Sequence, residues 1–173
     1  LLTLATLATA TAPAALDTLP RTPPAASMTL AKQSPTPPRP LLSVNTTAQL
    51  RAALERPDAA GRVALHLPEG NEYRLNGTQL RVHNIRASLQ SEGAGATLDA
   101  QGMSRHFDVA LGGELHLDRV HMLRGGSQFA GGTALVRLGG TLTATDVRMA
   151  DSEAVARGGA VAVGDDDDSA LAR

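Results

Sequence analysis

Two carboxylates and an arginine are the residues whose types and spacing come closest to a chemical site. Asp118 and Arg119 are neighbours in the chain, and Asp146 follows Arg119 by 27 positions (146 − 119 = 27). Carboxylates are calcium ligands, but calcium takes about six to eight oxygens, usually from several converging groups. Two carboxylates do not supply that number, so we interpret them as surface charges on adjacent turns of a repeat.

Four of the five histidines alternate with apolar residues, so their rings are expected to point away from the interior. These four are His66, His83, His116 and His121. A zinc site needs about three or four converging ligands. At the same spacing, His116 matches Thr143 (143 − 116 = 27) and His121 matches Arg148 (148 − 121 = 27), so the rings do not stack. We therefore predict no metal site and no catalytic residue.

Two further features resemble binding motifs and have simpler interpretations. The acidic run Asp165 to Asp168 is interpreted as a solvated block of like charge. Loose cation binding and protection of a strand edge are the alternatives. Gly93-Ala94-Gly95 lacks the further glycine and the helix that a dinucleotide fingerprint requires. We expect no cofactor.

Aromatic rings, which sugar-binding sites usually expose, make up only 2% of the chain. They are Tyr73, Phe107 and Phe129, and the pattern around Phe107 indicates that it points inward. Cysteine is absent, which removes disulfides, thiol catalysis and Cys-ligated zinc. The formal net charge of −1 gives no indication of a nucleic-acid partner.

The 173 residues divide into four parts. Residues 1–15 are apolar and uncharged, which is typical of a signal or membrane-anchor remnant, with a low-complexity tail as the alternative. Residues 16–43 are rich in proline, which lacks an N–H, so a disordered linker is expected. Residues 44–164 carry a strand pattern, and residues 165–173 form an acidic tail. We interpret the chain as a fragment of a longer protein or an incomplete gene product.

A short helix is expected at the start of the strand-rich part, over residues 47–55. Thr46 and Gln49 have the spacing of a capping box, and the apolar residues that follow fall on one helical face. Pro57 ends the pattern. Because the apolar end of a stack of repeats must be covered, we predict that this helix is a cap.

An internal repeat determines the predicted fold. A shift of 27 positions matches Val109 with Val136 and with Val163 (136 − 109 = 27; 163 − 136 = 27). The same shift places Gly112-Gly113 on Gly139-Gly140. Apolar residues thus recur inside short alternating segments, and glycines, which adopt φ > 0 readily, recur at the corners.

This pattern predicts a parallel β-helix with about four to five turns and a spacing of about 4.8 Å between turns. One turn is expected to contain strands at 134–138, 141–144 and 146–149. Arg119 should then stack on Asp146, and Arg124 on Asp151, as favourable opposite charges. Leu98 precedes Val120 by 22 positions (120 − 98 = 22), which predicts a shorter or irregular turn upstream.

The segments VNTTAQLRAAL, RVALHLPEGNEYRL and GGTALVRLGGTLTATDVRMA resemble pectate-lyase-like β-helix domains. They are most similar to the non-enzymatic branch of polymorphic outer membrane proteins and adhesin-like surface proteins. In that branch a helix leads into a strand, a Pro-x-Gly-x-x-Tyr turn and strands separated by Gly-Gly; Pro68, Gly70 and Tyr73 match the turn. The resemblance implies a right-handed β-helix and, in pectate lyases, carboxylates that hold calcium beside a basic arginine.

We therefore predict an all-β fold, a right-handed parallel β-helix with a short N-terminal capping α-helix and a disordered N-terminal tail. The leading functional hypothesis is a non-catalytic, secreted or cell-surface scaffold that contacts protein or carbohydrate ligands. The alternatives are a fragment of a polysaccharide lyase or hydrolase whose catalytic turns are missing, and a gene product without activity of its own. No nucleic-acid partner is expected.

Overall fold

The computed structural model describes residues 41–155 and 158–164. They belong to the unit Pro38–Arg173. The expectations for residues 1–15, for the linker up to residue 40 and for residues 165–173 lie outside the described residues.

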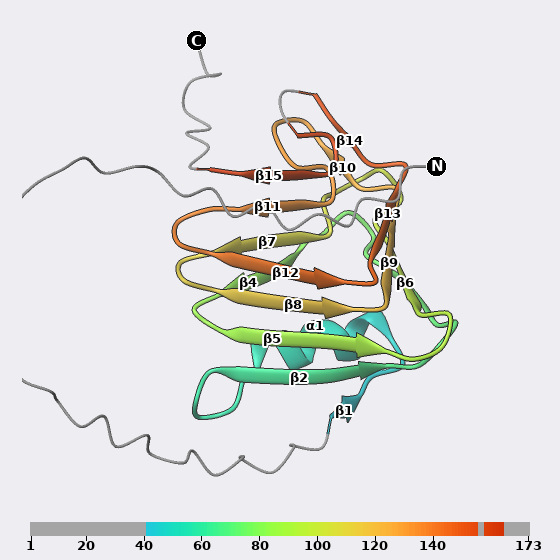
Figure 1. Cartoon of the computed structure of the whole chain (residues 1–173), viewed down its shortest axis with the longest axis vertical. Coiled ribbons are helices and arrows are strands. Elements are labelled where there is room, and N and C mark those ends of the chain that lie inside the picture. The colour runs from blue at the N-terminus through green and yellow to red at the C-terminus, as the bar shows by residue number, and fades with distance from the viewer. Residues whose placement is uncertain (1–40, 156–157, 165–173) are drawn as a thin grey trace, which may run out of the picture. The chain divides into compact units, whose positions relative to one another are not determined.

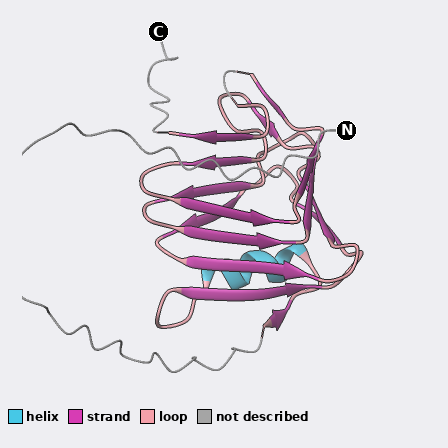
Figure 2. Ribbon diagram, viewed as in Figure 1, coloured by secondary structure: helices cyan, strands magenta, loops and turns pink. Residues whose placement is uncertain are grey.

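Parallel strands stacked in about four turns form the described unit, as Figures 1 and 2 show. The longest strands form one sheet, called sheet A. Its order is β1 (Leu42–Ser43), β2 (Arg62–Leu67), β5 (Arg86–Ser91), β8 (Glu114–Asp118) and β12 (Thr141–Thr145). Every neighbouring pair is parallel, which confirms the predicted solenoid. The ladder begins at Leu42, before the expected boundary at residue 44.

Two shorter four-stranded sheets complete each turn. Sheet B has the order β3 (Glu72–Arg74), β6 (Ala96–Asp99), β9 (Val120–Leu123) and β13 (Arg148–Ala150). Sheet C has the order β4 (Leu80–His83), β7 (Phe107–Ala110), β11 (Ala134–Val136) and β15 (Val161–Val163). A two-stranded ribbon, β10 (Gly126–Ser127) with β14 (Glu153–Ala154), lies between sheets B and C in chain order.

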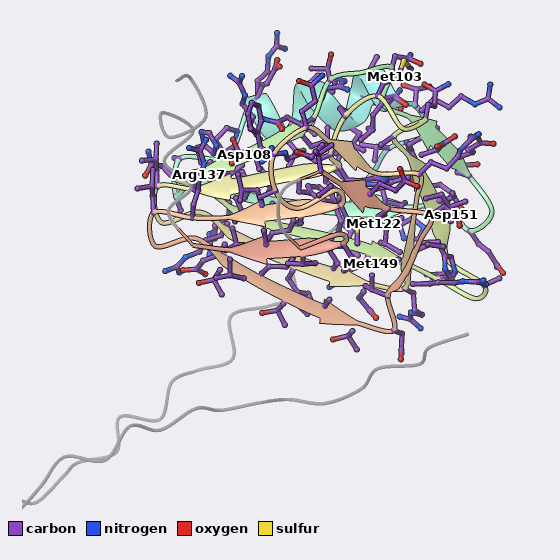
Figure 3. The ribbon with its side chains drawn as sticks, turned by 90° about the horizontal axis from the view of Figure 1, so that it is seen from above. Met103, Asp108, Met122, Arg137, Met149 and Asp151 are labelled. Carbon is purple, nitrogen blue, oxygen red and sulfur yellow. The ribbon has the colours of Figure 1, made fainter. Side chains whose placement is uncertain are left out.

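The predicted register is confirmed in the later turns. Val136 pairs with Val109 on one side and with Val163 on the other. Met149 pairs with Met122, and the two lie close together when the solenoid is viewed from above in Figure 3. Like residues therefore stack in columns that fill the interior.

In sheets A and B, the earlier turns have lengths that differ from 27 residues, as predicted. Ala87 pairs with Val63 below (87 − 63 = 24) and with Leu115 above (115 − 87 = 28). Leu98 pairs with Met122 (122 − 98 = 24), whereas Val120 pairs with Ala96 (120 − 96 = 24). The turn is therefore shorter, as predicted, but Leu98 does not lie against Val120.

Glycine pairs form the two later corners between sheets C and A, after β7 and after β11. Leu111 and Leu138 adopt φ of +53° and +50°, and the glycine after each continues in the left-handed region. The second glycine has a different role: a Cβ on Gly113 would lie 2.0 Å from the carbonyl oxygen of Val82, in the turn below. A side chain at that position is sterically excluded, so the corner can pack directly on its neighbour.

Helix α1 (Thr47–Glu55) matches the predicted range. The side chain of Thr46 accepts a hydrogen bond from the Gln49 N–H at 3.2 Å. Gln49 Oε1 in turn accepts from the Asn45 N–H at 2.8 Å, one residue before the position that a standard capping box uses. Leu50 and Leu54 are buried, so the apolar face packs on the interior. No helix within residues 41–155 and 158–164 is long and apolar enough to span a membrane.

The helix closes the N-terminal end of the stack. It packs against β2 and β4, and Figure 2 shows it beside the first turns. Arg51 on α1 donates to the backbone oxygens of Leu75 (2.7 Å), Gln79 (3.3 Å) and Thr78, all in the corner that leads into β4. The Tyr73 hydroxyl donates to the Val44 oxygen at 2.6 Å inside the core. Together these bonds attach the cap to the first turn, as the sequence predicted.

Candidate functional site

The outer face of sheet A carries a groove that is lined by four successive strands. Outward residues of four successive strands stack in two rows. The first row is Arg62, Arg86, Glu114 and Thr141, and the second is Ala64, Ser88, His116 and Thr143. The groove, of about 310 Å³, lies over these rows and crosses all four strands. We call it the sheet A groove.

Short polar side chains give the sheet A groove its chemistry. Ser88, Thr141 and Thr143 supply hydroxyls, and His116 supplies a partly exposed ring, so donors and acceptors are both present. The charged residues of the first row pair locally: Arg86 Nε lies 3.1 Å from Glu114 Oε1, and Arg62 Nε lies 3.4 Å from Asp58 Oδ2. The surface of the groove is therefore mainly apolar, with a few hydrogen-bonding groups along its rows and without a strong excess of charge.

Asp108 is the centre of a second polar cluster, on the outward side of sheet C. Its carboxylate is 3% exposed and lies 3.3 Å from Arg137 at both oxygens, 3.2 Å from His83 Nε2 and 3.4 Å from Gln79 Nε2. Figure 3 shows Asp108 and Arg137 side by side. Burial raises the pKa of Asp108, but the hydrogen bonds and charge of Arg137 and the charge of His83 outweigh it, so the pKa lies below the ordinary value.

Asp99 is neutralised in a similar way at the end of β6. Arg124 donates to both of its oxygens, with Nε 3.0 Å from Oδ1, and the Gln101 N–H donates at 2.8 Å. Burial raises the pKa of Asp99. The Arg124 and Gln101 hydrogen bonds, with the charges of Arg124 and Arg74, lower it by more, so the pKa lies below the ordinary value. Arg124 thus reaches back to the preceding turn. Its corner does stack on that of Asp151, because the Arg124 N–H donates to the Ala150 oxygen at 3.0 Å and both residues have positive φ, +53° and +54°. The charge of Asp151 acts favourably on Arg124, but the guanidinium hydrogen-bonds with Asp99.

The pair Asp118 and Arg119 also differs from the prediction. The corners of Arg119 and Asp146 do stack, because the Arg119 N–H donates to the Thr145 oxygen at 3.0 Å and both residues have positive φ, +54° and +51°. The Arg119 guanidinium, however, pairs with Asp118 of its own turn at 3.1 Å and not with Asp146. The backbone register is confirmed, and the side-chain pairing across turns is not.

The four histidines selected from the sequence are all partly exposed and lie on outward positions, as expected. They do not gather: His83 contacts Asp108, His116 lies in the sheet A groove, and His121 Nε2 lies 2.6 Å from the Ala94 oxygen. Ala94 also donates its N–H to Glu69 Oε1 at 2.7 Å, so the Gly93-Ala94-Gly95 segment is a corner held from the turns on both sides.

His106 is the residue that the sequence pattern missed. Its ring is 0% exposed, and Nε2 lies 3.0 Å from the Leu98 oxygen. Burial lowers the pKa of His106, although the carbonyls of Leu98 and Leu123 and the charge of Asp99 oppose that effect. His106 lies in a corner between β6 and β7, outside any alternating segment, so alternation carried no signal about its burial.

Within the described residues, no group of three or more His, Asp or Glu side chains converges in a way that could hold a metal ion. Asp99 and Asp108, which are buried, each serve as acceptors for an arginine. Phe107 points into the core, as predicted, and Tyr73 is buried as well. Phe129 is 36% exposed, in the loop after β10 and away from the sheet A groove.

Comparisons of this chain with protein-family models, with curated proteins and with solved structures find no match.

Proposed function

We propose that the chain is a non-catalytic β-helix scaffold, exported or displayed at a cell surface, that contacts protein or carbohydrate ligands through the sheet A groove. Within that class, the Pro68, Gly70 and Tyr73 turn and the glycine-paired corners favour the non-enzymatic, adhesin-like branch of pectate-lyase-like domains. The apolar segment at residues 1–15 supports export, because it is typical of the hydrophobic part of a signal.

The observation that carries the proposal is that the described residues lining the groove supply hydrogen-bonding groups but not a pair of carboxylates. Acid–base catalysis on sugars uses carboxylates that face the substrate from both sides of the scissile bond. Among the described residues that line the groove, Glu114 is the single carboxylate, and an arginine neutralises it at 3.1 Å. The hydroxyls and the ring that line the groove are suited to hydrogen bonding with a ligand laid across the strands.

A binding assay with matched variants tests this proposal. Ser88→Arg and Thr143→Arg place a long side chain in the second row of the groove, whereas Thr97→Arg does the same on the outward face of sheet B. The probes are printed arrays of polysaccharides and of extracellular matrix proteins. We expect wild type and Thr97→Arg to bind the same probe and both groove variants to lose at least tenfold in signal. Absence of binding, or equal binding by all four proteins, would contradict the proposed contact face.

A second assay addresses catalysis. Wild type is incubated with polygalacturonate and calcium, and unsaturated products are followed by their absorbance. We expect no product above the level of a heat-denatured control. Product that disappears in the groove variants would overturn the non-catalytic proposal in favour of a lyase.

A further inference from the structure

His106 is buried between two loops that follow sheet B in successive turns. The lower loop is residues 101–106, and the upper loop is residues 125–133. The loops are joined by the Gly126 N–H to the Ser104 oxygen at 3.0 Å, by the His106 N–H to the Thr133 oxygen at 2.8 Å, and by Arg105 Nη2 to Ser127 Oγ at 3.0 Å. The His106 ring is buried in the same corner and its Nδ1 faces Gly125 of the upper loop, so its protonation state bears on the contact between the loops.

The ring is accommodated in its neutral form. Carbonyl oxygens only accept hydrogen bonds, so the contact of Nε2 with the Leu98 oxygen places the single ring proton on Nε2. Nδ1 has no hydrogen-bond partner among the described residues and faces Gly125, where an added Cβ would lie 3.1 Å away. A proton on Nδ1 would place a buried positive charge against the upper loop, which is costly without a charged partner. The carbonyls of Leu98 and Leu123 reduce that cost but do not outweigh burial.

The charged groups around the ring do not offer that partner. Asp99, at the end of β6, is the acid that acts on the ring, and both of its oxygens are taken by Arg124. Arg105 precedes the ring in the chain, and Asp108, two residues after it, is held by Arg137. Residues 125–133 contain no ionisable side chain.

We propose that protonation of His106 releases the upper loop from the lower loop, so that this side of the solenoid opens reversibly in mild acid. The device is independent of the sheet A groove, because none of the residues that line the groove belongs to either loop. It would couple the shape of the corner between sheets B and C to the acidity of the surroundings.

The direction of the pH effect on loop opening follows from the protonation states of the ring in the closed and open forms. Opening exposes the ring, whose pKa then returns to about 6.5, whereas burial holds the pKa lower in the closed state. The contribution to closure is therefore complete above about pH 6.5 and is lost as the pH falls below that value. Where only the open form binds the proton, the opening equilibrium rises by up to about tenfold per pH unit.

Amide hydrogen exchange tests the proposal on the full chain. Between pH 7.5 and 5, after correction for intrinsic rates, the amides of Gly126 and His106 should lose up to about tenfold of protection per pH unit below 6.5. Amides of β8 should keep theirs. The control His116→Gln, which changes a partly exposed histidine, should behave like wild type, and His106→Gln should abolish the pH dependence.

A direct titration keeps the test independent of any variant. The His106 ring, followed by NMR in wild type, should begin to titrate over the same pH interval in which the two amides lose protection. Protection that is constant with pH, a loss shared equally by β8, or the same loss in His106→Gln would each overturn the proposal. None of these results bears on ligand binding by the sheet A groove, so this proposal and the proposed function fail separately.

Discussion

The first and last described turns of the solenoid differ in how their apolar columns end. At the N-terminal end, α1 covers the columns, and Leu65 and Leu67 of β2 are at most 1% exposed. At the other end, Leu142 and Met149 are only partly buried, and Val163 is 81% exposed although its partner Val136 is 5% exposed. Residues of identical type and register thus lie in two environments.

The sequence repeat specifies where an apolar residue lies in the stack, whereas burial determines how much that residue contributes to stability. The repeat places Met149 directly above Met122. The contribution of each apolar side chain to the free energy of folding, however, depends on the apolar area that is removed from water, at about 25 cal/mol per Å². A covered turn and an end turn with the same sequence pattern should therefore contribute very different stabilities. Matched substitutions at equivalent positions of two successive turns measure this contrast directly.

The largest effect is expected for the methionine column. Met122 is 0% exposed, so Met122→Ala should leave a cavity and reduce the free energy of unfolding by about 2–5 kcal/mol. Met149→Ala removes the same atoms from a partly exposed position, and we expect less than half of that loss. Urea unfolding followed by circular dichroism measures both. Equal losses would show that the last turn is as well packed as the one below it.

A glycine pair gives the second contrast. A Cβ on Gly132 would lie 2.3 Å from the Glu153 oxygen, whereas a Cβ on Gly159, its equivalent one turn later, would meet nothing closer than the Ser152 oxygen at 3.6 Å. Gly132→Ala should therefore cost about 1–3 kcal/mol through overpacking. Gly159→Ala should change stability by no more than about 0.5 kcal/mol. The same unfolding assay applies, and a loss for Gly159→Ala as large as that for Gly132→Ala would contradict the difference in packing between these two positions.

The later turns were predictable because their inward positions repeat in the chain without a change of spacing. Val109, Val136 and Val163 recur at the same inward position, and the Gly-Gly corners recur with Val109 and Val136. The earlier turns differ in length at several corners, and the corner between sheets C and A is one of them. Asn84 alone adopts positive φ before Ile85, whereas Leu111 and Gly112 both do so in the next turn. Changes of corner length leave the ladders intact, so alternation could not reveal them.

Side-chain partners were less predictable than the backbone register. Arg124 was expected to pair with Asp151 above and instead pairs with Asp99 below, because a long guanidinium side chain can reach either turn. The buried carboxylate gains more from an arginine than an exposed one does, since an unpaired buried charge is costly. Burial decided the partner, and the sequence did not reveal which aspartate was buried.

The smallest effect on stability is expected at the N-terminal end, which α1 covers. Thr46→Ala removes the bond from the Gln49 N–H to Thr46 Oγ1 and should cost about 1 kcal/mol, the usual value for an N-cap. Thr47→Ala, one residue later and outside this bond, is the matched control and should stay within about 0.5 kcal/mol. Because α1 covers only the first turn, amide exchange should accelerate in β2 and remain unchanged in β12. An equal acceleration in both strands would mean that the cap stabilises the whole stack as one cooperative unit, and the two ends would then differ in burial but not in local stability.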